Sequence, residues 1–496
     1  MISVVQWHGF LLQLAHELFD DCTLTSRPHS HTSRAGDTKT NVLMPTWLAY
    51  RIECMTLLNE YSFFARQLLN GATDVGALLP TSKYAARAMV SEAARRRGPR
   101  RILEVGCGTG PITSEIVNLL RPGDELVLCD INIPFIDYMK QRFDQEARFS
   151  HVKQQVEFQA CSATMLDESR SFDFIISALP FTRLGSDLTH QIIEKYRRML
   201  ASGGVVSYIE YAYLRSIKDA VVRSKDSSSS VVDSLLSGNE FRRDTIWRNA
   251  PPAWVHHLRF DDPDATKAGM ITPMEHTQRI RIGAAIIDTD ASGFMIGGVV
   301  AAWALSKTVK RGTWFLPLIA GGMAAWFLRD PERTSVADEP ETAPILSACD
   351  GRVLSVEHVS DALLGETTWL RIAVFLAITD VHVNRYPIGG KVIDIIRKSG
   401  SHAVASGTEA ESNEAQYTIL EAENGERVVV AQRVGAIARR IVNRSRIGSL
   451  VARGEKFGLI RFGSRTDVYL PAETTKCDVK PGDIVIGGET VIARFK

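Results

Sequence analysis

The chain has 496 residues, 23% of them charged and 45% hydrophobic, which is too long for one hydrophobic core and predicts two or three soluble domains. The formal net charge of +1 gives no general attraction to nucleic acid, so no nucleic-acid partner is expected. Seven cysteines without a CxxC pair argue against structural disulfides and a zinc knuckle, and no metal site is predicted.

Residues 1–45 predict an N-terminal arm that is partly disordered. Polar residues interrupt the apolar pattern of the first 22 residues and no basic stretch precedes it, so a signal peptide is not indicated. Residues 24–42 are rich in Ser, Thr, His and Asp, which is typical of a disordered link. A helical pattern follows over residues 47–69, at the start of a domain that we expect over residues 46–260.

A glycine-rich turn lies between a predicted strand and a predicted helix in RRILEVGCGTGPITSEI. Glu104 precedes its three glycines, Gly106, Gly108 and Gly110, and the next strand ends in Asp130. A carboxylate there can accept hydrogen bonds from ribose hydroxyls, which both S-adenosylmethionine and a dinucleotide carry. A GxGxG turn alone does not separate these two cofactors.

The stretch FDFIISALPF predicts a fourth strand that ends in a Pro-aromatic turn, and RRMLASGGVVSYIE follows it. This succession resembles S-adenosylmethionine-dependent methyltransferases and implies an α/β Rossmann-like domain. In that family the glycines admit the cofactor against bare backbone, and the acidic residue at Glu104 can engage the methionine amine. Many relatives end the third strand in an aspartate that binds adenine, and Ser162 is the positional candidate here.

Three stretches narrow the resemblance, namely GALLPTSKYAARAM, SALPF and WRNAPPAWVHHLRF. They are similar to bacterial phospholipid N-methyltransferases, which implies methylation of phosphatidylethanolamine. The resemblance also implies membrane docking through a helix within residues 47–69, with Lys83 and Arg87 near anionic headgroups. RNA dimethyltransferases carry a related turn, usually with Asn where this chain has Ser177. An RNA or protein substrate, or a domain that has lost catalysis and only docks on membranes, stays open.

Residues 224–240 predict a polar loop inside this domain, and residues 261–282 predict a linker. Two apolar runs then follow within residues 283–330, and a basic connection separates them. Each run is shorter than the roughly 20 residues that a helix needs to cross a bilayer. They predict an apolar helical hairpin that is re-entrant or lies in a membrane interface, and the alternative is a hairpin buried in a globular core.

Residues 331–496 alternate short β-rich runs with Gly and Pro turns, which predicts a mostly β domain. Within it Ser464 follows Gly463, and we expect Ser464 on a turn. A glycine carbonyl is easily approached and serine supplies a hydroxyl, as a backbone self-cleavage site requires. The segments PILSACDGRV, LAITDVHVNRYPIGGKV, AIARRIV, GEKFGLIRFGSRTDVYLP and VKPGDIVIGGETVIA together resemble the short form of phosphatidylserine decarboxylase.

The resemblance implies that the chain cuts itself between Gly463 and Ser464 and that Ser464 becomes a pyruvoyl group. Ser464 Oγ would attack the Gly463 carbonyl to form an ester, and ammonia would leave later. The two cleaved fragments, α and β, would remain partners. A hydroxyl is a weak nucleophile near neutrality, so a base must lie within hydrogen-bond reach. The motifs carry three candidates, Asp350, Asp380 and His382.

The identity of the base is open. Asp380 and His382 are two residues apart and share a face if their segment is a strand. Long-form decarboxylases have a second histidine three positions after the first, where this chain has Arg385, which cannot act as a base at ordinary pH. Either Asp350 acts as the base or His382 serves both stages, and His402 is a further candidate.

The two resemblances predict a bifunctional enzyme on the cytoplasmic face of the cell membrane. Its β domain would decarboxylate phosphatidylserine with a pyruvoyl group derived from Ser464. Its α/β domain would N-methylate the resulting phosphatidylethanolamine with S-adenosylmethionine. The expected partners are a phospholipid membrane and these two lipids, and a homo-oligomer is compatible with this assignment.

Overall fold

A computed structural model describes residues 81–181, 184–211, 228–249, 251–274, 279–282, 285–308, 312–333, 344–365, 367–404, 407–436, 440–461 and 464–496. The predicted N-terminal arm, the predicted helix within residues 47–69 and Gly463 lie outside the described residues.

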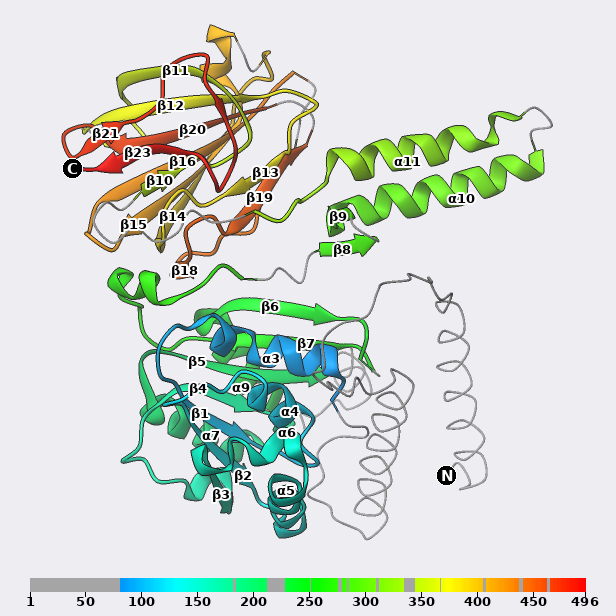
Figure 1. Ribbon diagram of the computed structural model, residues 1–496, viewed down its shortest axis with the longest axis vertical. Coiled ribbons are helices and arrows are strands. Elements are labelled where there is room, and N and C mark those ends of the chain that lie inside the picture. Colours follow the sequence, from blue (N-terminus) through cyan, green and yellow to red (C-terminus); the bar gives the residue numbers. More distant parts are fainter. Residues whose placement is uncertain are drawn as a thin grey trace, which may run out of the picture. The chain divides into compact units, whose positions relative to one another are not determined.

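The first domain is built on a seven-stranded sheet with the order β3-β2-β1-β4-β5-β7-β6 (Figure 1). Strands β1 to β5 run parallel, and β7 and β6 add an antiparallel edge. Its strands are β1 (Arg101–Val105), β2 (Glu125–Asp130), β3 (Val156–Ala160), β4 (Phe172–Ser177), β5 (Leu200–Tyr211), β6 (Glu240–Ile246) and β7 (Ala253–Leu258). The strand order reverses between β1 and β4, and ligands of open α/β sheets bind beyond the strand ends at such a point.

Apolar side chains fill both faces of this sheet because helices cover each of them. Met89 of α3 and Ile116 of α4 belong to one buried cluster, and Ile192 and Tyr196 of α7 belong to the other. The predicted α/β Rossmann-like fold is confirmed. The helices are α3 (Lys83–Arg95), α4 (Pro111–Val117), α5 (Ile133–Gln145), α6 (Ala147–Ser150), α7 (Ser186–Met199) and α9 (Ser228–Asn239), with the 3-10 helices η1 (Lys153–Gln155) and η2 (Ala163–Met165).

The polar loop predicted over residues 224–240 is wrong, because α9 occupies most of that range. Val232 is fully buried and Leu236, four positions later, packs against the same cluster as α7. Four-residue spacing places both side chains on one helix face, so this apolar stripe outweighs the serine-rich composition. The predicted linker contains the 3-10 helix η3 (Ala265–Met270), which buries Ala268.

Two apolar helices, α10 (Ser292–Thr308) and α11 (Leu316–Phe327), pack against each other as a hairpin (Figure 1). A Cβ on Gly298 would lie 2.6 Å from the Pro317 carbonyl oxygen, so glycine is what lets the two backbones approach. A short antiparallel pair, β8 (Arg279–Ile282) and β9 (Ala285–Asp288), precedes them, with the 3-10 helices η4 (Thr289–Ala291) and η5 (Gly312–Phe315). None of the helices in the described part of the chain combines the length and hydropathy that crossing a bilayer requires.

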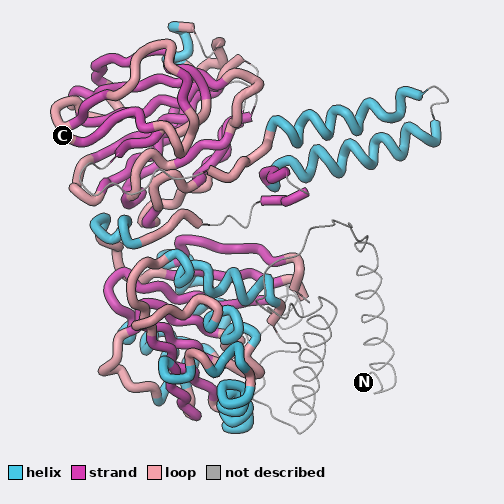
Figure 2. Tube along the Cα trace, in the orientation of Figure 1, coloured by secondary structure: helices cyan, strands magenta, loops and turns pink. Residues whose placement is uncertain are grey.

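The last domain is mostly β, as predicted (Figure 2), and its strands pair antiparallel throughout the described residues. An eight-stranded sheet has the order β18-β14-β15-β16-β20-β12-β11-β22, and two three-stranded sheets have the orders β13-β19-β17 and β10-β23-β21. The elements are β10 (Pro344–Leu346), β11 (Gly351–Ser360), β12 (Thr368–Leu376), β13 (Val383–Arg385), β14 (Gly390–Lys398), η6 (Thr408–Ser412), β15 (Ala415–Ala422), β16 (Arg427–Val434), β17 (Arg440–Asn443), β18 (Leu450–Val451), β19 (Lys456–Arg461), β20 (Ser464–Pro471), β21 (Thr475–Cys477), β22 (Ile484–Val485) and β23 (Val491–Phe495).

Candidate active sites

Ser464 is the first residue of β20 and pairs with Leu376 of β12 and Val434 of β16. The predicted turn position is therefore wrong, since Ser464 begins a strand that has neighbours on both sides. Its side chain is fully buried, and its Oγ has no hydrogen-bond partner among the described residues. Leaving a buried hydroxyl unpaired costs about 1–3 kcal/mol, so such a group calls for an explanation. An explanation is that Ser464 Oγ acts as a nucleophile and must stay available for reaction.

Three buried polar side chains lie on the same side of the sheet as Ser464. Thr466 follows two positions along β20, and Gln432 is its direct neighbour on β16. Asn384 Nδ2 donates to Thr466 Oγ1 at 3.0 Å, and Gln432 Nε2 donates to Asn384 Oδ1 at 2.8 Å. No motif in the sequence predicted this chain of amides. The alternation of Ser464 and Thr466 and the spacing of Asn384 two positions after His382 are the signals that it offered.

His382 precedes β13 and is almost completely buried. Its Nδ1 lies 3.0 Å from the backbone oxygen of Asp380, which can only accept, so Nδ1 carries the proton and Nε2 is left as the acceptor. Burial lowers the pKa of His382 to about 4, although Asp380 opposes this effect. The imidazole is therefore neutral near pH 7 and can act as a base. The segment is a turn followed by extended chain, so Asp380 and His382 do not lie in a strand, which was the condition for a shared strand face.

The two candidate carboxylates have different surroundings. Asp380 Oδ2 accepts from the Ala377 N–H at 2.8 Å and so closes the turn before His382. Asp350 accepts from Arg333 at 2.7 and 2.9 Å and from the Gly487 N–H at 2.8 Å. Burial raises the pKa of Asp350, and the Arg333 charge partly offsets this. The further candidate His402 is exposed, with its Nε2 3.9 Å from Glu414 Oε2.

Arg385, which stands in place of a second histidine, takes part in an ion pair. Its Nη2 donates to Asp330 Oδ1 at 2.8 Å, and its Nη1 donates to the Gly454 carbonyl at 3.2 Å. Asp330 belongs to the segment that follows α11 and is fully buried. Arg385 therefore has a structural role between β13 and the end of the hairpin.

The glycine-rich turn of the first domain connects β1 to α4. Gly106, Gly108 and Gly110 have φ values of +79°, +52° and +87°, a region that glycine enters without strain. A Cβ on Gly108 would meet no atom within 4 Å, so the backbone borders open space. A Cβ on Gly110 would lie 2.6 Å from the Met139 sulfur, so packing also requires glycine there.

Two buried carboxylates flank this turn at the ends of adjacent strands. Asp130, at the end of β2, accepts from the N–H groups of Gly108 and Asn132, each at 2.9 Å. Glu104, on β1, accepts from Thr113 Oγ1 at 2.7 Å, while its Oε1 has no hydrogen-bond partner among the described residues. Burial raises the pKa of Glu104 to about 8, and the nearby Asp130 adds to the effect. A cationic group near Oε1 would satisfy this site.

Ser162 and Ser177 close the ends of the next two strands. Ser162 Oγ accepts from the Thr164 N–H at 3.4 Å at the start of η2. Ser177 Oγ lies 3.1 Å from the hydroxyl of Tyr196. With Glu104 and Asp130 they lie at the carboxyl ends of four parallel strands, β1 to β4, so the structure gathers the predicted cofactor residues along one edge of the sheet.

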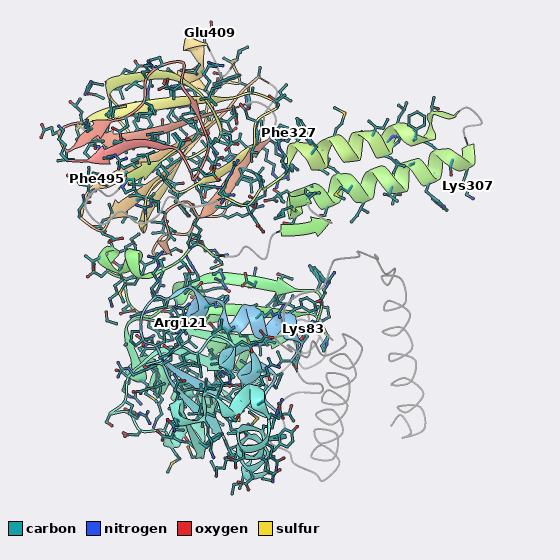
Figure 3. The ribbon with its side chains drawn as sticks, in the orientation of Figure 1. Lys83, Arg121, Lys307, Phe327, Glu409 and Phe495 are labelled. Atoms are coloured by element: carbon teal, nitrogen blue, oxygen red, sulfur yellow. The ribbon has the colours of Figure 1, made fainter. Side chains whose placement is uncertain are left out.

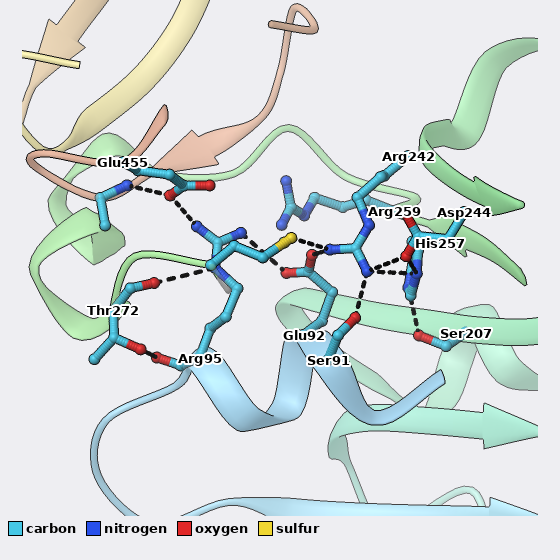
Figure 4. A network of polar contacts seen from close by, with 12 residues as sticks. Ser91, Glu92, Arg95, Ser207, Arg242, Asp244, His257, Arg259, Thr272 and Glu455 are labelled. Carbon is cyan, nitrogen blue, oxygen red and sulfur yellow. Dashed lines mark hydrogen bonds and ion pairs between the residues drawn. The ribbon is translucent and has the colours of Figure 1, made fainter. Parts of the chain in front are cut away.

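A buried polar network that no motif announced joins α3 to β6 and β7 (Figure 4). Arg242 forms ion pairs with Glu92 and with Asp244, the latter at 2.8 Å. Its Nη2 also lies 2.7 Å from His257 Nε2. Burial acts to raise the pKa of Glu92, but the charges of Arg242 and Arg95 outweigh it and lower this pKa to about 2. The network holds α3, the helix that precedes the glycine-rich turn in the sequence, against β6 and β7 at the antiparallel edge of the sheet.

The fold and the two sites define a two-part enzyme, in which an α/β domain with a glycine-rich cofactor turn precedes a β domain with a buried serine. A phosphatidylserine decarboxylase family model matches residues 321–493, and a methyltransferase domain model matches residues 102–204. The phosphatidylserine decarboxylase proenzyme of Symbiobacterium thermophilum is 39% identical over 204 residues, 40% of this chain and 92% of that protein. That of Saccharopolyspora erythraea is 40% identical over 207 residues, 41% of this chain and 85% of that protein. The chain belongs to the phosphatidylserine decarboxylase family.

Two solved structures are similar to the first domain. One is the N-methyltransferase NodS from Bradyrhizobium japonicum WM9 in complex with S-adenosyl-L-homocysteine. Its alignment with this chain has 18% sequence identity and a TM-score of 0.30, and it spans 40% of this chain and 98% of the NodS chain. Another is the O-methyltransferase TomG from Streptomyces achromogenes in complex with SAM. Its alignment has 13% sequence identity and a TM-score of 0.31, and it spans 42% of this chain and 90% of the TomG chain.

Proposed function

We propose that this chain catalyses two consecutive reactions on phospholipid, decarboxylation of phosphatidylserine and N-methylation of the phosphatidylethanolamine so formed. One observation carries the proposal: a domain of the phosphatidylserine decarboxylase family and a methyltransferase domain occur in one chain. The first reaction produces a primary amine, and a primary amine is an acceptor that a methyltransferase can use.

In the β domain, Ser464 is the residue that generates the reactive group. Its Oγ attacks the Gly463 carbonyl, and His382 is the base that accepts the proton at Nε2. His382 is favoured over Asp350 because its imidazole is neutral near pH 7, whereas Asp350 already accepts from Arg333 and from a backbone N–H. When formed, a pyruvoyl group derived from Ser464 supplies an electron sink for decarboxylation. Asn384 and Gln432 provide buried amides close to the strand that carries Ser464.

In the α/β domain, the residues fit S-adenosylmethionine. The unpaired Oε1 of Glu104 suits the methionine ammonium, and Asp130 suits the ribose hydroxyls. The open space beside Gly108 leaves room for a ligand against the backbone. The cofactor supplies an electrophilic methyl group, and the chain holds and orients it. Ser162 stands at the strand end where the adenine would lie.

The hairpin of α10 and α11 supports action at a membrane surface, which we propose is the cytoplasmic face. Large apolar side chains are exposed along it, among them Trp303 at 66% and Met323 at 66%, which argues against the alternative of a hairpin buried in a core. Lys307 lies at its far end, and Phe327 lies where the hairpin meets the β domain (Figure 3). An exposed apolar surface of this kind marks an interaction site, and tryptophans favour the interface of a bilayer.

The test is to incubate the purified chain with phosphatidylserine vesicles and S-adenosylmethionine labelled in its methyl group. The proposal predicts labelled, chloroform-soluble lipid that appears only after phosphatidylethanolamine has formed, and Glu104→Gln should reduce the label without reducing decarboxylation. Label in RNA or protein, but not in lipid, would assign the methyltransferase domain to another substrate. A calorimetric titration that detects no binding of S-adenosylmethionine would leave this domain as a docking module.

A further inference from the structure

The hairpin has a fully buried aspartate at each of its two ends next to the β domain, and we call these ends its feet. Asp288 ends β9 before α10 begins, and Asp330 follows the end of α11. Lys456 Nζ contacts both carboxylates, at 3.0 Å from Asp330 Oδ2. Arg444 donates to Asp288 at 3.0 and 3.1 Å, and Arg385 donates to Asp330 at 2.8 Å. Buried carboxylates need such partners, so the cluster fixes both feet to the β domain.

The two feet are also joined to each other by backbone hydrogen bonds. The Asp288 N–H donates to the Leu328 carbonyl at 2.9 Å, and the Asp330 N–H donates to the Ile286 carbonyl at 2.9 Å. Because charges and backbone bonds hold the same short segment, the end of α11 cannot move independently of β13 and β19.

The end of α11 and the residues after it contact the segment that carries Asp380 and His382. The ring of Phe327 lies on the imidazole of His382, with centroids 4.1 Å apart and planes inclined by 40°. Two positions on, Arg329 Nη2 donates to the Thr379 carbonyl at 2.6 Å, one residue before Asp380. Phe327 and His382 are both almost completely buried, so this contact excludes water from one face of the imidazole.

We propose that Phe327 is a positioning residue for His382, so that the foot of the apolar hairpin forms one wall of the decarboxylase site. This inference rests on the proposed role of His382. The Nδ1 hydrogen bond to Asp380 fixes one edge of the imidazole, and the buried Phe327 ring packs against one of its faces. The charged groups that act on His382 are Asp380 and Arg329, and neither is altered when Phe327 is replaced.

The experiment compares Phe327→Leu with Phe457→Leu in the full-length chain. Phe457 is equally buried in the β domain but stacks on Tyr386, at a centroid distance of 4.7 Å, so the same change there controls for lost packing. Decarboxylation of phosphatidylserine in mixed detergent micelles is measured across pH on the processed fraction. Phe327→Leu should lower kcat about tenfold with KM nearly unchanged, and water admitted to the imidazole should move the acid limb about one pH unit upward. Phe457→Leu should keep the wild-type profile.

A second measurement does not need activity. In a Ser464→Ala background, which prevents processing, the titration of His382 is followed by NMR with and without Phe327→Leu, and Phe327→Met serves if the leucine variant does not accumulate. The substitution should raise the pKa of His382 toward its ordinary value. An unchanged titration together with equal pH profiles for both phenylalanine variants overturns the proposal. An inactive wild-type chain would instead refute the proposed function.

Discussion

Arg385 donates from Nη2 to Oδ1 of Asp330 at 2.8 Å, and both side chains are buried. This pair places a permanent cation where long-form decarboxylases have their second histidine, and it leaves His382 as the histidine next to β13. The position has therefore exchanged a titratable group for an anchor of the hairpin foot. We therefore expect replacement of Arg385 to affect the stability of the folded chain more than proton transfer in the active site.

Arg385→Gln removes a cation that pairs with Asp330. The variant loses a charge-assisted hydrogen bond to a buried carboxylate that Lys456 still contacts, so the free energy of unfolding should fall by about 1.5–3 kcal/mol in urea titrations. Arg397→Gln is the control, because that exposed side chain pairs with Glu414 at 2.7 Å and such pairs contribute about 1 kcal/mol or less. Equal losses for the two variants would contradict the structural role of Arg385.

Glu92 should make stability depend on pH at the acid end. Its pKa falls from 4.5 to about 2 in the folded chain, so its contribution is present above pH 4.5 and is lost as the pH falls toward 2. Glu92→Gln should lower the free energy of unfolding by about 3 kcal/mol at pH 7 and flatten the decline between these pH values. Glu157→Gln, at an exposed site where solvent screens the ion pair with Arg170, should flatten the decline much less. A wild-type slope in Glu92→Gln would refute this account.

Glu104 should release a proton when S-adenosylmethionine binds. Its pKa of about 8 keeps the buried carboxyl protonated at pH 7, and a ligand ammonium would favour the carboxylate. Calorimetry in two buffers with different ionisation enthalpies measures this proton. Glu104→Gln should abolish the buffer dependence and weaken binding about tenfold. Glu115→Gln, on the neighbouring helix α4, should behave like the wild type, and a buffer dependence that survives in Glu104→Gln would be inconsistent with this assignment.

Thr466→Val should slow self-processing, because it removes the acceptor that orients Asn384 beside the strand of Ser464. Thr418→Val is a closely matched control, since Thr418 is also fully buried and accepts from Asn443 Nδ2 at 2.7 Å. Each change should cost about 1–3 kcal/mol of stability. The appearance of fragments on a denaturing gel should slow only in Thr466→Val, and equal rates in both variants would remove the amide chain from the mechanism.

The sequence alone predicted those features of the fold and the site that depend on residues close together in the chain. The glycine turn, the acidic residues Glu104 and Asp130, and the β-rich C-terminal domain all follow from short stretches whose residue types serve one purpose. The serine-rich composition at the start of α9 led to the wrong prediction of a loop, because the buried apolar pair Val232 and Leu236 stabilises the helix.

Contacts between residues that are far apart in the chain could not be predicted from the sequence. Nothing in the spacing of Asp330 and Arg385, 55 positions apart, announces their pairing. The tilted ring contact of Phe327 with His382 and the amide chain through Gln432 also depend on how the strands and the hairpin fold together. The motifs identified the candidate groups, whereas their partners, and hence their charge states, required the structure.

The central claim is that Ser464 turns its own peptide bond into a reactive carbonyl, and the intact mass of freshly purified chain under denaturing conditions tests it most directly. The account predicts two fragments, the smaller spanning the 33 residues 464–496 with a blocked N-terminus that reacts with hydrazines, and a single uncut chain for Ser464→Ala. A wild-type chain that stays uncut and does not react with hydrazines would contradict it.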